Sequence, residues 1–222
     1  MKPYVILNAG MTIDGKIVTA KNSSNMSSEE SLIRVHKLRK NMDAIMVGIG
    51  TVLADNPRLN VRKVDANPED NPIRIVVDSK CRTPTGAYIT NNDARTIIAG
   101  ANEFKHDFLT SDRYNVFKQK DVEFFFSGDT HVDLTVLMNY LANEGIKTLM
   151  LEGGSTLNFS MLKEALIDEI NVSIAPKVVG GVNAKTLFDG EGFDTMDDAV
   201  NLDLMDSFFL GKDLILKYKV LK

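Results

Sequence analysis

Short runs of apolar residues recur along the chain and predict its strands. Several of these runs are continuous rather than alternating, which is typical of strands covered on both faces. The predicted strands are Tyr4 to Leu7, Ala44 to Val47, Ile73 to Val77, Thr96 to Ala99, Val122 to Phe126, Thr148 to Leu151, Ile170 to Ile174 and Leu214 to Tyr218.

Three segments between these runs have helical periodicity. The first follows Ser28, the second follows Asp133 and ends near Gly145, and the third begins at Ser155. Ser and Asp are good N-caps, and Gly commonly follows a helix end. The three apolar faces consist of Leu32, Val35 and Leu38; of Leu134, Leu137, Met138 and Leu141; and of Leu157, Met161 and Leu162.

The alternation of strands and helices predicts an α/β fold with a mixed, mostly parallel sheet flanked by helices. The last fifty residues contain strand and loop signals without a clear helix, so antiparallel pairing is expected at one edge. Polar loops such as residues 65–72 carry turn residues but do not resemble domain linkers. We therefore expect one domain over residues 1–222.

Composition narrows the class of protein. The 222 residues carry a net charge of −4, which is not the basic footprint of a nucleic-acid binder. A single Cys excludes a disulfide framework and fits a reducing compartment, so a cytoplasmic location is expected. No run approaches the eighteen apolar residues that a membrane span requires. An anionic ligand must therefore be bound by a local group of basic residues.

The strongest local signal lies where a predicted strand meets a helix, at Glu152-Gly153-Gly154-Ser155-Thr156. Glycines permit close backbone approach to a ligand, and free N–H groups at a helix start attract phosphate. The segment matches neither the three-glycine dinucleotide fingerprint nor a Walker loop. Phosphate binding and a simple tight turn capped by Ser155 are equally good interpretations of these residues alone.

Two further strand ends carry polar residues. Thr51 and Asp55 lie four apart after Val47-Gly48, so a helical turn would point both side chains the same way. The strand ending at Val76-Val77-Asp78 continues into Ser79, at the place where ligands gather in α/β sheets. The ordinary alternatives, a helix cap with a surface carboxylate and a polar turn, fit each segment better when it is considered alone.

A basic run follows Pro57. If residues 58–62 are extended, Arg58, Asn60 and Arg62 share one face, and two guanidinium groups at that spacing suit a phosphate. The alternative is a solvated basic loop. After the first strand, small residues near Ala9 leave room for a flat ring, Asp14-Gly15 signals a turn, and Lys16 is either a participant in polar chemistry or a surface residue.

The remaining residues favour a reaction driven by a cofactor. The three His residues and Cys81 lack partners at metal-ligand spacing, so no metal is expected. No Gly-x-Ser-x-Gly elbow is present, and no Cys–His arrangement can be supported. Phosphate-binding turns without a nucleophile suit hydride transfer, in which the cofactor supplies the chemistry.

An ordered set of motifs resembles the riboflavin-biosynthesis reductases, which have a dihydrofolate-reductase-like fold. The resemblance is dense in the first 80 residues and extends over nearly the whole chain, with its stand-alone archaeal and fungal form the most similar. The zinc-deaminase motif of the bifunctional bacterial form is absent, so deamination is not expected. The motifs are Asp14-Gly15-Lys16, Met26 to Glu30, Arg34 to Arg39, Asp43 to Gly48, Thr51 to Pro57, Leu59, Arg62 and Leu151 to Gly154.

The resemblance implies NADPH as cofactor, a phosphorylated pyrimidine ribosylamine as substrate, and a homodimer. It implies reduction of the ribosylamino group to a ribitylamino group, with Glu152 and Lys16 as the candidate catalytic residues. Asn25 departs from the bacterial form, in which an aromatic residue is common. The implied cofactor residues are Ala9, Thr51, Asp55, Val76, Val77, Asp78, Ser79, Gly153, Gly154, Ser155 and Thr156, and the implied substrate residues are Ser23, Arg39, Leu59, Arg62 and Glu152.

Two alternatives stay open. A pterin or folate reductase could use the same fold, although folates carry no phosphate for an Arg58–Arg62 pair to bind. A non-catalytic regulator could bind NADPH without turning over any pyrimidine ribosylamine. The residues alone do not decide whether Lys16 or a carboxylate supplies a proton.

Overall fold

The structure, a computed structural model, describes residues 1–222 except Asn22, Asn25 and Ser27, so the expectation for Asn25 lies outside the described residues. The chain divides into two compact units. Unit 1 comprises residues 1–3 and 36–150, and unit 2 comprises residues 4–35 and 151–222. Helix α1 (Glu29–Lys40) and strand β6 (Thr148–Leu151) each continue across a boundary between the units. One domain over the whole chain stays a prediction.

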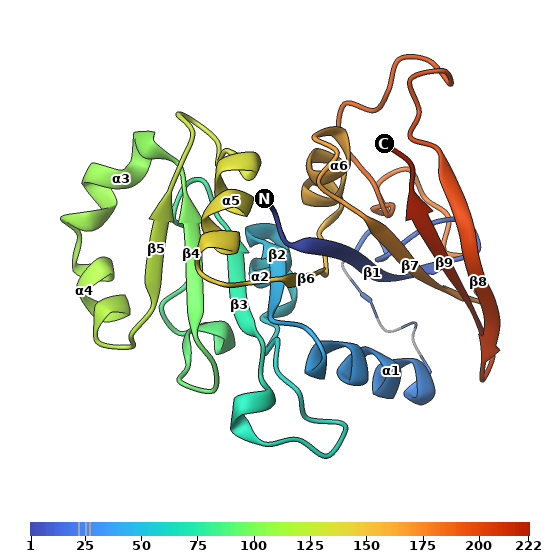
Figure 1. Ribbon diagram of the computed structural model, residues 1–222, viewed down its shortest axis with the longest axis horizontal. Helices are drawn as coiled ribbons and strands as arrows, with labels where there is room; N and C mark the ends of the chain where they lie inside the picture. Colours follow the sequence, from blue (N-terminus) through green and yellow to red (C-terminus); the bar gives the residue numbers. More distant parts are fainter. Residues whose placement is uncertain (22, 25, 27) are drawn as a thin grey trace. The chain divides into compact units, whose positions relative to one another are not determined.

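The strands of unit 1 are ordered β5-β4-β3-β2-β6 (Figure 1), and β2 to β5 pair in parallel. The centres of β2, β3 and β4 are fully buried, as continuous apolar runs predict for parallel strands. The sequence predictions for these strands are confirmed to within one residue at each end. The bounds are β2 (Ala44–Gly48), β3 (Ile73–Val77), β4 (Thr96–Gly100) and β5 (Glu123–Phe126).

Four helices belong to unit 1: α2 (Ile49–Asp55), α3 (Asn102–Leu109), α4 (Asp112–Lys118) and α5 (Leu134–Asn143). The predicted cap of α5 is confirmed, because the Asp133 carboxylate accepts a hydrogen bond of 2.8 Å from Val136 N. Helices α3 and α4 were not predicted. They are short and gain stability from a tertiary aromatic cluster, in which Phe108 packs on Phe124 at a centroid distance of 4.6 Å.

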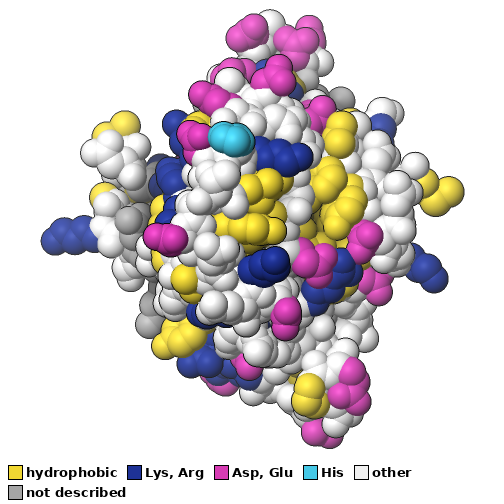
Figure 2. All heavy atoms as spheres, turned by 90° about the vertical axis from the view of Figure 1, so that its left-hand side faces the viewer, with side chains coloured by type: hydrophobic (Ala, Val, Ile, Leu, Met, Phe, Trp, Pro, Cys, Tyr) yellow, Lys and Arg dark blue, Asp and Glu magenta, His cyan; other side chains and the backbone are white. Residues whose placement is uncertain are grey.

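The face of unit 1 on which β5, α3 and α4 lie shows hydrophobic side chains surrounded by charged ones (Figure 2). Strand β5 is an edge strand of the sheet and carries three consecutive phenylalanines, all half-buried. Phe125 stacks on Tyr140 of α5 at 4.1 Å, and the Lys105 ammonium lies 5.6 Å from the centre of the Phe126 ring. Neighbouring side chains therefore cover part of this apolar edge.

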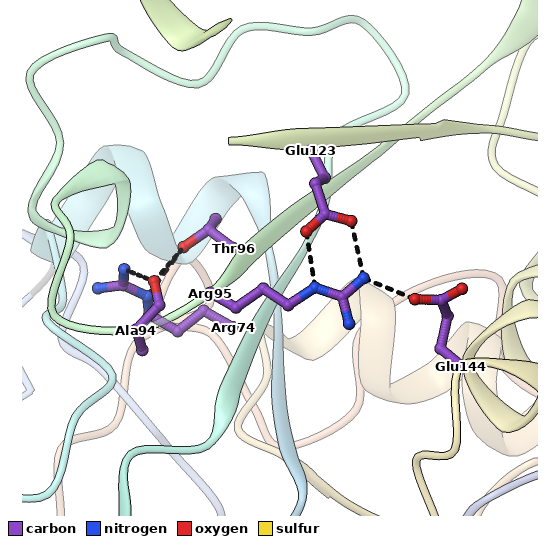
Figure 3. A network of polar contacts seen from close by, with 6 residues as sticks. All are labelled: Arg74, Ala94, Arg95, Thr96, Glu123 and Glu144. Atoms are coloured by element: carbon purple, nitrogen blue, oxygen red, sulfur yellow. Dashed lines mark hydrogen bonds and ion pairs between the residues drawn. The ribbon is translucent and has the colours of Figure 1, made fainter. Parts of the chain in front are cut away.

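Two arginines, one on β3 and one directly before β4, differ sharply in environment (Figure 3). Arg74 of β3 is fully buried and donates to Thr96 Oγ1 and to the Ala94 carbonyl. Burial lowers its pKa to about 10. Arg95, beside β4, is partly exposed and contacts Glu123 and Glu144, which raise its pKa. Arg74 thus fixes the loop before β4, whereas Arg95 forms a surface ion-pair network.

Unit 2 contains the strands β1 (Tyr4–Thr12), β7 (Glu169–Ala175), β9 (Asp213–Val220) and β8 (Leu202–Leu210), in that order. Strands β1 and β7 are parallel, whereas β9 is antiparallel to both β7 and β8. The predicted antiparallel edge near the C-terminus is confirmed. Strand β8 was not predicted because Asp203 and Asp206 interrupt its apolar pattern, and a bulge separates Leu204 from Asp206.

Helix α6 (Ser155–Lys163) and the start of α1 complete unit 2. The predicted cap of α1 is confirmed, since Ser28 Oγ accepts a hydrogen bond of 3.2 Å from Ser31 N. The buried carboxylate of Asp213 accepts hydrogen bonds from the hydroxyls of Ser28 and Ser31, at 3.0 and 2.5 Å. A residue of β9 therefore fixes the start of α1, which the sequence did not predict.

In the part of the chain that the structure describes, no helix is both long and apolar enough to cross a membrane. The same residues contain no group of three His, Cys, Asp or Glu side chains that could hold a metal ion. Cys81 is buried, and desolvation raises the pKa of its thiol to about 12.

Candidate functional site

The Gly-Gly turn occurs where the sequence predicted it. Strand β6 ends at Leu151, Gly153 has a φ of +94°, and Gly154 is the N-cap of α6. A positive φ is accessible to glycine at little cost and strains other residues. The first N–H groups of α6 have no acceptor within the helix, so the turn suits an anionic group. Glu152 is half-buried directly before it.

The two hydroxyl residues after the glycines differ. Gly154, not Ser155, is the N-cap, so the interpretation of Ser155 as a cap is wrong. Ser155 is buried, and its hydroxyl bonds to the carboxylate of Asp189, whereas Thr156 is exposed. Thr156 is therefore the more accessible of the two predicted cofactor residues.

Thr51 and Asp55 lie on α2, which follows β2 directly. The helical turn that would point both side chains the same way is confirmed. Thr51 is half-buried and Asp55 is exposed at the last position of the helix. The next residue, Asn56, adopts a left-handed conformation with a φ of 41° and ends the helix.

The residues after β3 are fixed by internal hydrogen bonds. Val76 and Asp78 are fully buried, and the Asp78 carboxylate accepts from Thr83 N and Oγ1 at 2.7 and 2.8 Å. Ser79 Oγ accepts from Val132 N at 3.2 Å. These side chains shape the loop, while Val77 and Ser79 are half-buried at the strand end.

The basic run after Pro57 is not extended, which corrects the expectation that Arg58, Asn60 and Arg62 share one face. Leu59 is buried and has a left-handed φ of 47°, so the alternation of side chains breaks at this residue. The Arg58 guanidinium instead lies 4.2 Å from the centre of the Tyr88 ring. Arg58 and Arg62 therefore have different environments.

The fold joins Arg62 to Arg39 through Asn60. Arg39 is buried in the last turn of α1 and donates to the Asn60 carbonyl at 3.1 Å. Arg62 is exposed and donates to Asn60 Oδ1 at 3.0 Å. The backbone N–H of Arg62 also donates to Nδ1 of the buried His36. Arg39 and Arg62, both implied substrate residues, thus contact the same residue, Asn60, which the sequence had placed on one face with Arg58 and Arg62.

In unit 2, the predicted turn at Asp14-Gly15 is confirmed, with a φ of 76° at Gly15. The Asp14 carboxylate accepts from Thr12 Oγ1 and Gly180 N, and these hydrogen bonds lower its pKa to about 2. Lys16 is half-buried, and its ammonium donates to the Ala184 carbonyl at 2.9 Å. The turn is therefore attached to the segment that follows β7.

The other predicted residues of unit 2 are less enclosed. Ala9 is half-buried on β1 opposite Val172 of β7. Ser23 is exposed, and its backbone N–H donates to Thr19 Oγ1 at 3.1 Å. The predicted site residues are thus divided between the units: Thr51, Asp55, Val76 to Ser79, Arg39, Leu59 and Arg62 lie in unit 1, and Ala9, Lys16, Ser23 and Glu152 to Thr156 lie in unit 2.

Comparison with known proteins shows the family to which the chain belongs. Residues 3–216 match the model of the RibD C-terminal domain. The chain belongs to the RibD C-terminal domain family. The 2,5-diamino-6-ribosylamino-4(3H)-pyrimidinone 5′-phosphate reductase of Methanothermobacter thermautotrophicus is 53% identical over 220 residues, which cover 99% of each chain. The family expected from the motifs is therefore confirmed.

Solved structures agree with this membership. RibD of Acinetobacter baumannii matches 99% of this chain and 58% of its own, with a TM-score of 0.83 and 26% sequence identity. A dihydrofolate reductase from Enterococcus faecalis matches 99% of this chain and 97% of its own, with a TM-score of 0.54 and 11% identity. The second likeness shows the fold alone, and the expected dihydrofolate-reductase-like α/β fold is confirmed.

Proposed function

We propose that the chain is a reductase of riboflavin biosynthesis. It converts the ribosylamino group of 2,5-diamino-6-ribosylamino-4(3H)-pyrimidinone 5′-phosphate to a ribitylamino group. The observation that carries the proposal is the 53% identity, over 99% of both chains, to a protein named as the reductase of this substrate. We also propose a cytoplasmic location, which the single Cys supports.

NADPH is the proposed cofactor, and the described residues suit it. The Gly-Gly turn leads into α6, whose first backbone N–H groups have no acceptor within the helix and can bind a phosphate. Thr51 and Asp55 present a hydroxyl and a carboxylate on one side of α2, and Val76 to Ser79 supply the end of β3. Ala9 leaves space for the nicotinamide ring. When bound, NADPH supplies the hydride.

The proposed substrate residues combine positive charge with polar and apolar groups. Arg39 and Arg62, joined through Asn60, would bind the 5′-phosphate, because guanidinium groups match phosphate oxygens. Ser23 and Glu152 would contact polar groups of the substrate, and Leu59 would contribute an apolar contact. Glu152 would orient the sugar hydroxyls.

The reaction requires a hydride and a proton. The ribosylamine opens to an imine, C1′ of which gains the hydride, and the imine nitrogen gains the proton. Lys16, whose ammonium donates to the Ala184 carbonyl, is the proposed proton donor. Most of the acceleration would come from holding the reacting carbon in place.

Incubation of the protein with NADPH and the pyrimidine ribosylamine phosphate is expected to remove the nicotinamide absorbance and to yield one ribitylamino product per NADPH consumed. Dihydrofolate with NADPH serves as the control for a folate reductase and is expected to give no turnover. If the protein bound NADPH but the nicotinamide absorbance did not fall after the pyrimidine substrate was added, the result would favour a regulator. Turnover of dihydrofolate but not of the pyrimidine would favour a folate reductase.

A homodimer is part of the proposal, and unit 2 offers a surface for it. Strand β8 is an edge strand of the sheet. Four of its apolar side chains are 40–75% exposed: Leu202, Leu204, Met205 and Phe209. Exposure of several apolar side chains on an edge strand is energetically unfavourable unless a partner covers them. The ion pair between Asp206 and Lys217 places both charge signs beside them, so a second copy provides a complementary surface.

We expect Phe209→Lys to convert a dimer into a monomer, as measured by sedimentation equilibrium, because a charge would be buried in an apolar interface. Val136→Lys is the matched control. Val136 is 45% exposed on α5 of unit 1, and its replacement should leave the dimer intact. Equal dimer content in the wild type and Phe209→Lys would remove β8 from the interface.

A further inference from the structure

Asp189 lies in the long segment between β7 and β8 and forms a compact set of hydrogen bonds. Its Oδ1 accepts from Thr186 Oγ1 at 2.5 Å and from Thr186 N at 3.2 Å. Thr186 Oγ1 also lies 3.1 Å from the Phe188 carbonyl. Residues 186–189 therefore form a closed local turn around the carboxylate.

The same residue contacts the start of α6. The backbone N–H of Asp189 donates to the Ser155 carbonyl at 3.4 Å, and the Ser155 hydroxyl bonds to the Asp189 carboxylate. Burial acts to raise the pKa of this carboxyl, but hydrogen bonds from Thr186 and Ser155, with the charge of Lys16, outweigh it and hold the pKa below its usual value. The ionised form is the one that these donors require.

Close packing continues at the next residue. Gly190 has a φ of +154°, and a Cβ atom there would lie 2.7 Å from Cδ1 of Phe159 on α6. The backbone at Gly190 thus packs directly against the Phe159 side chain. A cavity of about 510 Å³ borders the same residues, because Asp189, Gly190 and Phe159 line it together with Leu162 and Phe193.

On its other side, the turn is joined to Lys16. Lys16 and Thr186 form an isolated antiparallel bridge, and Ile17 N donates to the Lys185 carbonyl at 3.0 Å. The Lys16 ammonium donates to the Ala184 carbonyl. The bridge and these hydrogen bonds therefore connect Lys16 and Ile17 to residues 184–186, and Thr186 is in turn hydrogen-bonded to Asp189, which contacts Ser155.

We propose that Asp189 is a positioning residue that fixes the Gly153–Gly154 turn for the cofactor phosphate and keeps it in register with Lys16. The inference rests on the proposed reductase function and adds a residue that no predicted motif contains. Without the carboxylate, the start of α6 would have to become ordered when the cofactor binds, which reduces affinity.

The test uses the variants Asp189→Ala, Asp189→Asn and Ser155→Ala, the double variant of Asp189→Ala with Ser155→Ala, and Asp194→Asn as control. Asp194 is an exposed carboxylate in the same segment. The dissociation constant of NADPH is measured by its nicotinamide fluorescence. Amide hydrogen exchange of residues 153–157 is measured without NADPH, so that this readout is independent of turnover.

Asp189→Ala is expected to raise the dissociation constant and the KM for NADPH about five- to tenfold, while the KM for the pyrimidine substrate changes less than about twofold. Exchange at residues 153–157 should accelerate. Ser155→Ala should act in the same direction, and the double variant should be no worse than Asp189→Ala, because the contact is shared. Asp189→Asn, which retains the shape of the side chain, should lose less affinity for NADPH. This variant should fold even if Asp189→Ala does not.

Three outcomes would overturn the inference: unchanged NADPH affinity in the folded Asp189 variants, an equal effect in Asp194→Asn, or additive effects of Asp189→Ala and Ser155→Ala. A wild type that binds NADPH but reduces no pyrimidine would contradict the proposed function alone, because NADPH affinity and exchange would still report on Asp189. A wild type that does not bind NADPH would overturn both.

Discussion

Replacement of Arg74 with methionine is expected to lower the free energy of unfolding by about 3 kcal/mol or more, as measured by urea denaturation, because several acceptors lose their donor at once. Arg74 is fully buried, and its guanidinium donates to Asn91 Oδ1 at 2.8 Å, to the Asn91 carbonyl at 2.5 Å and to Thr96 Oγ1 at 2.9 Å. Methionine fills much of the volume but leaves these buried and half-buried acceptors without the guanidinium donor, which costs more than the loss of the bonds themselves.

The neighbouring arginine provides the control. Arg95→Met removes contacts with Glu123 and Glu144, but the Arg95 side chain is 35% exposed, so water can solvate what remains. Surface pairs of this kind contribute up to about 1 kcal/mol. If Arg95→Met destabilised the protein as much as Arg74→Met, burial would not be the reason for the effect.

Arg62→Ala is expected to weaken binding of the phosphorylated substrate by about tenfold or more, since a charged hydrogen bond contributes about 1.5–3 kcal/mol. NADPH should bind the variant nearly normally. Calorimetric titration of both ligands tests the expectation. A dephosphorylated substrate should bind the wild type poorly and the variant hardly worse, because the tested contact is already missing.

The structure adds a matched variant to this experiment. Arg58 lies four residues before Arg62, but its guanidinium packs on the Tyr88 ring. Arg58→Ala should therefore leave affinity for the phosphate nearly unchanged. Two results would assign Arg62 a structural role outside the phosphate site. One is an equal loss of substrate affinity in Arg58→Ala and Arg62→Ala; the other is an equal loss of affinity for the phosphorylated and the dephosphorylated substrate in Arg62→Ala.

Local pattern was sufficient for much of the architecture. Strands β3 and β6 have the predicted bounds, because continuous apolar runs exclude most alternatives in an α/β chain. The caps Ser28 and Asp133 were predicted because a side chain within three residues satisfies the backbone N–H groups of the first turn. The family followed from an ordered set of motifs, each of which was weak alone.

The sequence determined which residue types stand at strand ends and helix starts, because turn and cap preferences act over a few neighbouring residues. Tertiary structure decided which side chains meet. The left-handed Leu59 turns Arg58 away from Arg62, and Asn60 joins Arg62 to Arg39 instead. Asp189 reaches Ser155 across more than thirty positions of sequence. Such contacts depend on how distant segments fold back on one another, which no local pattern of residues encodes.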